Sequence, residues 1–291
     1  MMMRAAVGIA ALLLCSTAAI ADDDIPPVVG GRTYVQHQIV AAKIRHPQIS
    51  SIEVVGLRED GKGSIVLGST SDIARVMTPV AHPDDTLGGH AAPGGLFVVH
   101  EPFESSTHHR IGTIAIALRH AAGTPTAPLT RIADRVAADM ANATLSAKNA
   151  ADPYPYDKRF GPTTYAQALT DRTIVKHPDL LVMMIHATPP TGDKNVIIGS
   201  NIGRLGKVAD DDDLRVIRNG ETNLEIGGEK DRFETELPLN DAAGKRIGAL
   251  GLVFNYRDGA DKEAIHAHGL AIRDEIAAQI PRSAALFAPA H

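Results

Sequence analysis

The sequence has a single cysteine, Cys15, among its 291 residues. Cys15 lies in an N-terminal segment that we expect to be removed from the mature protein. Disulfides, thiolate metal sites and cysteine nucleophiles are therefore excluded together from the mature chain. Its stability must come from packing.

Long hydrophobic runs are lacking except at the N-terminus. There, a basic start at Met1–Arg4 precedes an apolar stretch, Ala5–Cys15, and the small residues Ala19-Ile20-Ala21. This pattern predicts a secretory signal peptide over residues 1–21, since the apolar stretch is too short to cross a bilayer. We expect the mature chain to begin at Asp22 and to reside in a bacterial periplasm. No later segment reaches the roughly 20 continuous apolar residues of a membrane helix, so we predict no insertion into the membrane.

Clusters of basic residues and the usual catalytic motifs are lacking as well. The net charge is -5, and no group of lysines and arginines lies near aromatic residues, which argues against nucleic acid and anionic membranes as partners. The sequence has no Gly-x-Ser-x-Gly elbow and no phosphate-binding loop. Glu234 and Glu236 alternate on a predicted strand and could share a face, but we interpret them as salt-bridged surface residues. We therefore predict no catalytic residues, no enzymatic activity and no cofactor.

What the sequence does contain is a repeat. Thr33-Tyr34-Val35-Gln36 recurs 131 positions later as Thr164-Tyr165-Ala166-Gln167, and both copies run on to a His-Pro pair. Later segments recur in the same order, namely Gly68-Ser69 as Gly199-Ser200 and Arg110-Ile111-Gly112 as Arg246-Ile247-Gly248. Two modules of about 135 residues fit the usual size of a domain. We predict a first module over residues 22–147, a proline-rich linker over 148–162 and a second module over 163–291.

Each copy has the same predicted elements. A helix ends at the His-Pro pair, His46-Pro47 or His177-Pro178, because proline disfavours helical geometry in the residue before it. Two strands joined by a glycine-containing turn follow, at 49–57 and 64–68 or 180–186 and 195–199. A further strand and an amphipathic helix end each module, at 110–118 and 129–145 or 245–256 and 262–280. This order predicts an α+β fold in which helices pack on a mainly antiparallel sheet.

The second copy resembles the extracytoplasmic PAS-like sensor modules called Cache domains. The resemblance depends on four segments, which are Gly199–Gly203, the acidic run Asp210–Asp213, Glu236–Asp241 and Gly244–Leu252. It implies a five-stranded antiparallel sheet with a long N-terminal helix on one face and a small-molecule pocket on the other. We therefore expect two tandem PAS/Cache-like modules, the second being the clearer match.

Candidate ligand-binding residues lie in the segment of the second module that would cap this pocket. An arginine guanidinium pairs naturally with a carboxylate or phosphate, which favours a small polar or anionic ligand. By strand alternation, a histidine next to Ile185 lies on the less buried or pocket face. The first copy differs in its Ser69–Asp72 loop and lacks the acidic run, so we assign binding to the second module and a structural or dimerisation role to the first. The candidates are His186, Ser200, Asn201, Arg204, Lys207 and Arg215.

Metal binding is the alternative that the sequence leaves open. The spacing of the acidic run Asp210–Asp213 does not fit an EF-hand, so we interpret the run as a turn that starts a helix and predict no metal ligands there. The chain contains 13 histidines, which keeps a metal site open. No two of them have the i, i+4 spacing that places two ligands on one face of a helix. The candidate ligands for a transition metal are His82, His90, His108, His109, His266 and His268.

The function expected from these features is that of a periplasmic sensing protein. It would bind a small polar or anionic ligand and act through a membrane receptor, a sensor kinase or a transporter. The alternative is a periplasmic protein that binds a metal or a metal chelate, and a third reading is an interaction scaffold. A homodimer is compatible with each of these functions.

Overall fold

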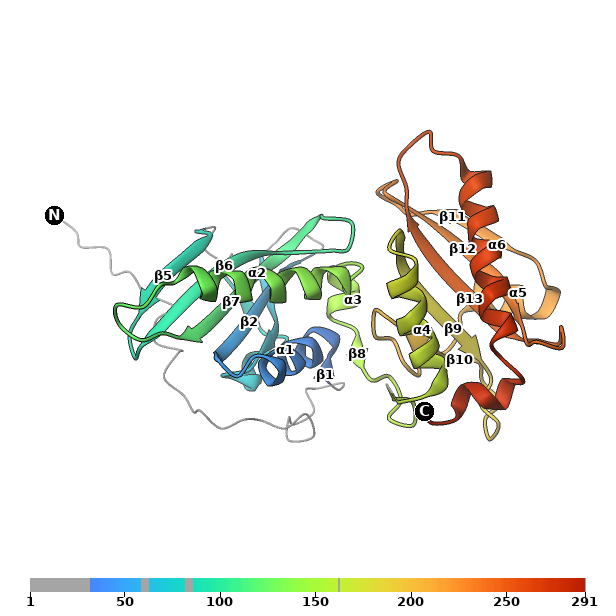
Figure 1. Ribbon diagram of the computed structural model, residues 1–291, viewed down its shortest axis with the longest axis horizontal. Coiled ribbons are helices and arrows are strands. Elements are labelled where there is room, and N and C mark those ends of the chain that lie inside the picture. The colour runs from blue at the N-terminus through green and yellow to red at the C-terminus, as the bar shows by residue number, and fades with distance from the viewer. Residues whose placement is uncertain (1–31, 59–62, 82–85, 162, 291) are drawn as a thin grey trace. The chain divides into compact units, whose positions relative to one another are not determined.

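A computed structural model describes residues 32–58, 63–81, 86–161 and 163–290 (Figure 1). The predicted signal peptide and the predicted start of the mature chain at Asp22 lie outside these residues. The chain divides into two compact units, Met1–Pro153 and Tyr154–His291. None of the helices in the described part of the chain is long and apolar enough to cross a membrane.

Unit 1 is built on a six-stranded sheet in which all neighbouring strands are antiparallel. The strands across the sheet are β4 (Pro79–Val80), β3 (Ser64–Ser69), β2 (Ile49–Leu57), β7 (Arg110–Arg119), β6 (Leu96–Glu104) and β5 (Gly88–Ala92). Two helices, α1 (Tyr34–Arg45) and α2 (Ala127–Asn142), lie along the sheet in Figure 1. The remaining elements are β1 (Arg32–Thr33), η3 (Ile73–Arg75) and α3 (Ala147–Ala150).

Unit 2 repeats this arrangement with a five-stranded antiparallel sheet. Its strands across the sheet are β10 (Val196–Ser200), β9 (Leu180–Ala187), β13 (Arg246–Asn255), β12 (Arg232–Asn240) and β11 (Asn223–Ile226). The helices α4 (Tyr165–Lys176) and α6 (Lys262–Ala278) lie along it in Figure 1. The remaining elements are β8 (Pro153–Tyr154), α5 (Asp211–Asn219) and η4 (Ser283–Phe287).

The fold prediction is confirmed, because the order β3-β2-β7-β6-β5 of unit 1 matches the order β10-β9-β13-β12-β11 of unit 2. Each unit has a hydrophobic core of its own between sheet and helices. Ile39, Ile52 and Ile116 are fully buried in the first core, as Ile185 and Ile272 are in the second. The chain is thus an α+β protein made of two tandem modules, each an antiparallel sheet with helices packed on it.

The repeated Thr-Tyr-x-Gln motif has a structural cause, which is the same in both units. The side chain of Thr33 caps α1 by accepting a hydrogen bond from the Gln36 backbone N–H. The Gln36 side chain then bonds both backbone groups of Ser69 at the end of β3, at 3.1 and 2.8 Å. In unit 2 the Gln167 side chain bonds the backbone of Ser200 in the same way, at 3.0 Å for both bonds. The motif therefore ties the first helix of each module to the end of the second strand.

The repeated glycines let backbones approach closely. A Cβ at Gly199 would meet Thr170 Oγ1 at 2.7 Å and the Ala166 carbonyl oxygen at 2.8 Å, so only glycine allows α4 to lie this close to β10. A Cβ at Gly248 would overlap the carbonyl oxygen of His186 on the neighbouring strand. These positions explain why glycine recurs in the repeat.

The structure adds strands in the middle of each module. In unit 1, β5 and β6 precede β7. In unit 2, β11 precedes β12, which contains the strand predicted at Glu234 and Glu236. The division after Pro153 falls within the segment 148–162 that was predicted to be a linker. Ala150 is fully buried in the core of unit 1, and Phe160 packs in the core of unit 2. Both ends of that segment therefore belong to packed modules.

Candidate ligand site in unit 2

The sheet of unit 2 has two different faces. On β12, Leu237 points into the hydrophobic core beneath α4 and α6, together with Ile185 of β9. Because side chains alternate along a strand, Glu234, Glu236 and His186 point to the opposite face. Helix α5 packs against β12 and β13, and its Asp213 reaches this opposite face.

His186 lies at the centre of this face and is almost completely buried, with 2% of its surface exposed. Its Nδ1 lies 3.4 Å from Asp213 Oδ2, and its Nε2 has no hydrogen-bond partner among the described residues. Burial lowers the pKa of His186, and the nearby carboxylates of Asp213 and Asp210 only partly oppose this effect. The imidazole is therefore held in its neutral form, which carries one donor and one acceptor nitrogen.

Two carboxyl groups meet next to this histidine. Burial and a hydrogen bond to Asp213 raise the pKa of Glu236 to about 9, so this carboxyl carries the shared proton at neutral pH. Burial by itself raises the pKa of Asp213, but the hydrogen bond from Glu236 and the nearby His186 bring it below its usual value. Asn223 donates a further hydrogen bond of 3.3 Å from Nδ2 to Glu236 Oε2. His186, Asp213, Glu236 and Asn223 thus form one cluster, which we call the buried polar cluster.

Glu234 lies on the same face of β12, two residues before Glu236. Burial and the neighbouring Glu225 raise its pKa, whereas Arg204 lowers it. The sequence-based interpretation of Glu234 and Glu236 as salt-bridged surface residues is wrong for Glu236, which is only 7% exposed. Its partner is a second carboxyl group instead of a base, because α5 covers this part of the sheet.

Two of the predicted cationic residues lie near the cluster. Arg204 and Lys207, in the loop between β10 and α5, are both half-buried and both lower the pKa of His186 through their charges. Lys207 acts in the same direction on Asp213. The structure therefore places Arg204 and Lys207 within electrostatic reach of His186, and the prediction that the three bind a ligand stays a prediction.

Ser200, the last residue of β10, and Asn201, the first residue of the following loop, form structural hydrogen bonds. The Ser200 backbone is held by Gln167, and the Ser200 Oγ accepts a hydrogen bond from the Ile202 backbone N–H at 3.2 Å. Asn201 Oδ1 accepts from the Met183 N–H at 2.9 Å, and its Nδ2 donates to the Leu181 carbonyl at 2.8 Å. Asn201 thereby extends the pairing of β10 with β9 by one residue.

Arg215 lies apart from the cluster on the exposed side of α5. Its guanidinium forms an ion pair with Asp212 at 2.9 Å, and about half of each side chain is exposed. The start of this helix agrees with the interpretation of the acidic run. Asp210 caps α5 and forms a reciprocal capping box with Asp213.

Sequence reasoning missed Asp213, Glu236 and Asn223 as members of a site. A signal for Asp213 was present, because it lies three residues before Val216, and residues three apart share one face of a helix. Val216 is 1% exposed and Asp213 is 6% exposed. An aspartate on the apolar face of a helix needs a polar partner in the interior.

The described residues of unit 1 contain no equivalent of the buried polar cluster. Sheet register places Val55 where unit 2 has His186, since Val55 pairs with Thr113 and His186 pairs with Ala249 at equivalent positions of β7 and β13. By the same register His100 stands where unit 2 has Glu236. The two modules share a fold and differ in the chemistry of this face.

No family model matches the chain, and no curated protein matches its sequence. The Cache resemblance is therefore not confirmed at the level of a family. Among solved structures, the GAF domain of nlh2 from A. Aeolicus aligns at a TM-score of 0.30 and 14% identity, over 40% of this chain and 82% of that chain.

Two further structures align at similarly low scores. The inducer-binding domain of the transcription factor PobR from Acinetobacter, in complex with 3-hydroxy benzoic acid, has a TM-score of 0.27 and 11% identity, over 40% of this chain and 95% of that chain. The periplasmic domain of RsbU from Chlamydia trachomatis has a TM-score of 0.22 and 11% identity, over 85% of this chain and 81% of that chain. Similarities of this size do not establish a function for this chain.

Proposed function

We propose that unit 2 binds a small polar ligand at the buried polar cluster, and that the protein senses or carries this ligand. The observation that supports the proposal best is His186, whose Nε2 is buried without a hydrogen-bond partner among the described residues. A buried polar atom left without a partner costs about 1–3 kcal/mol. A ligand that bonds to this nitrogen would recover that free energy.

The charges around the cluster favour a ligand with an anionic group. Arg204 and Lys207 are the cationic residues whose charges reach His186. A neutral His186 can form one hydrogen bond through Nε2, whereas the proton of Glu236 is already shared with Asp213. The proposed ligand therefore places a carboxylate or similar group near Arg204 and Lys207, and a hydrogen-bonding group at His186.

The remaining parts of the proposal concern the location and the partner. We expect export through the signal peptide predicted over residues 1–21, and a binding role without catalysis in the periplasm. The output would pass to a membrane receptor, a sensor kinase or a transporter. Unit 1, with Val55 at the position of His186, would serve as a structural or dimerisation module.

A thermal-shift screen of the exported chain tests the proposal. Carboxylates, amino acids, polyamines and nucleobases would be added singly, since a ligand at 100 times its dissociation constant stabilises the fold by about 2.7 kcal/mol. Arg204→Ala should abolish the shift caused by an anionic ligand. Arg215→Ala is the matched control, because it removes the same side chain from the exposed side of α5 and should keep the shift.

Two outcomes would contradict the proposal. If no compound stabilises the protein, unit 2 is not a small-molecule binding module and an interaction scaffold becomes the better account. If Arg204→Ala and Arg215→Ala both keep the full shift, the ligand binds elsewhere.

A further inference from the structure

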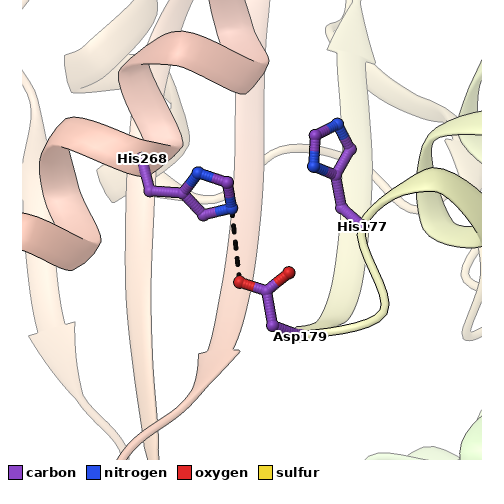
Figure 2. Close-up of side chains that lie close together, drawn as sticks. All are labelled: His177, Asp179 and His268. Atoms are coloured by element: carbon purple, nitrogen blue, oxygen red, sulfur yellow. Dashed lines mark ion pairs between the residues drawn. The ribbon is translucent and has the colours of Figure 1, made fainter.

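A second cluster of polar side chains lies on the helix-covered side of unit 2. Figure 2 shows His177 and Asp179 on the turn that follows α4, close to His268 on α6. His268 Nε2 lies 3.2 Å from Asp179 Oδ2, and the rings of His177 and His268 meet edge to face with centroids 5.6 Å apart. One potential ligand atom from each residue lies within 4.8 Å of the other two.

The local structure explains why these three side chains meet. His177 is the C-cap of α4, where the following proline ends the helix, and Asp179 lies in the turn that leads into β9. His268 lies on α6 one turn before Ile272, and its ring also contacts Phe254 of β13. The repeat prediction treated His177 only as a helix end. Its partner His268 is distant in sequence, so no spacing rule could have joined the two.

We propose that His177, Asp179 and His268 bind a divalent transition-metal ion of the zinc type. Two imidazoles and one carboxylate are ligands that zinc takes in proteins, and three protein ligands leave a position for water or another molecule. Adjacent ligands of a tetrahedral zinc ion, at about 2.0–2.1 Å from the metal, are about 3.3 Å apart. The three ligand atoms, which lie within 4.8 Å of one another, therefore need to close by at most about 1.5 Å, which rotations about their side-chain bonds can supply.

The state of His177 supports this assignment independently of the geometry. Its Nε2 is buried and has no hydrogen-bond partner among the described residues. The nearest carboxylate oxygen, Glu275 Oε2, lies 3.5 Å away and is already bonded to Lys176 Nζ at 2.6 Å. A metal ion would give the His177 imidazole a closer partner than this long contact with Glu275. Asp179 is 57% exposed at its side chain, so an ion can enter from solvent.

Unit 1 lacks this combination. His46 occupies the position of His177 at the end of α1, but Gln48 stands where Asp179 is, and Ile132 of α2 stands where His268 is. A metal in unit 2 would join the end of α4 to α6, which are the first and last long helices of the module. The site is on the opposite side of the sheet from the buried polar cluster and does not depend on the proposed ligand.

Equilibrium dialysis of the untagged, chelator-treated protein against Zn²⁺ tests the proposal. Wild-type protein should bind one Zn²⁺ ion per chain at micromolar zinc. His268→Ala and Asp179→Asn should each weaken that binding by at least about tenfold. Loss of a residue that only orients a metal ligand already lowers metal affinity by about tenfold or more. His46→Ala is the matched control and should leave the binding unchanged, because it removes the equivalent histidine from unit 1.

Circular dichroism of each variant separates loss of the site from loss of the fold. The proposal is wrong if the wild-type chain retains no zinc. It is also wrong if folded His268→Ala and Asp179→Asn proteins bind zinc as tightly as wild type, because the zinc would then occupy other histidines. Retention of zinc by a variant that no longer binds the organic ligand would show that the two sites are separate.

Discussion

His186 Nδ1 lies 3.4 Å from Asp213 Oδ2, and both side chains are buried, with 3% and 8% of their surface exposed. The contact joins β9 of the unit 2 sheet to α5. The sequence predicted that His186 lies on a pocket face. In the structure this histidine belongs to a buried network with Asp213, Glu236 and Asn223. The network is the chemical difference between the two modules.

The first prediction concerns the protonation of His186. Burial lowers the pKa of this side chain below the ordinary value of 6.5. An unfolded histidine gains a proton as the pH falls through 6.5, whereas the native one resists it, so this group's contribution to stability is lost at acidic pH. A titration of the imidazole ¹⁵N resonances should give His186 a midpoint below 6.5. A midpoint at or above that value would contradict the described environment.

The second prediction concerns Glu236, whose pKa is raised from 4.5 to about 9. Between these two values the native state keeps a proton that the unfolded state loses. The contribution of Glu236 to the stability of the fold is therefore complete below pH 4.5 and is lost as the pH rises toward 9. Glu236→Gln keeps a hydrogen-bond donor to Asp213 without the titration. Allowing for its partial exposure, the variant should be more stable than wild type at pH 8 by on the order of 1 kcal/mol. Denaturation midpoints between pH 5 and pH 9 would check this, and parallel pH profiles would count against it.

The third prediction concerns the glutamine that ties each first helix to its sheet. Gln167→Ala removes the two hydrogen bonds to Ser200, together with one to Asp171, and leaves the buried Ser200 N–H without a partner. This should lower the free energy of unfolding of unit 2 by about 1–3 kcal/mol. Gln36→Ala should do the same in unit 1, because its two bonds to Ser69 are equivalent. Urea denaturation of both variants measures the two losses. An unchanged free energy of unfolding in either variant would show that the glutamine–serine hydrogen bonds of the repeated motif do not stabilise the fold.

The fourth prediction separates a structural from a ligand-binding role for Asn201. In unit 1 the equivalent Thr70 accepts the hydrogen bond from the Ile52 N–H that Asn201 Oδ1 accepts from Met183. Asn201→Thr should therefore keep more stability than Asn201→Ala, which leaves the Met183 N–H unpaired at about 1–3 kcal/mol. Thermal denaturation of the pair would test this. Equal losses would argue that the Asn201 side chain matters for something other than this bond.

Much of the fold could be predicted because its signals are local. The His-Pro pairs marked the ends of α1 and α4, and the apolar spacing marked α2 and α6, since proline geometry and helical periodicity act over a few residues. The repeat then indicated that the two modules share one architecture. The strands β5, β6 and β11 fell in the part of the repeat that has diverged, so they were not predicted. Only a strand at Glu234 and Glu236, within β12, was predicted there.

The candidate site was harder to predict, because its members meet only through the sheet. Arg204 and Lys207 lie close enough to His186 for their charges to lower its pKa, and their role in ligand binding stays a prediction. Glu236 was taken for a surface residue because an alternating strand does not show which face is covered, and α5 covers it. Ser200 and Asn201 were candidates by resemblance, but the structure gives both of them bonds to the backbone.

The most direct test of the account is the imidazole ¹⁵N spectrum of His186 during titration of the protein with compounds that raise its melting temperature. The account predicts that at least one such compound shifts the His186 Nε2 resonance in a saturable way, at the concentrations that stabilise the fold. If every stabilising compound leaves that resonance unchanged, the ligand does not meet His186, and the buried polar cluster is not the binding site.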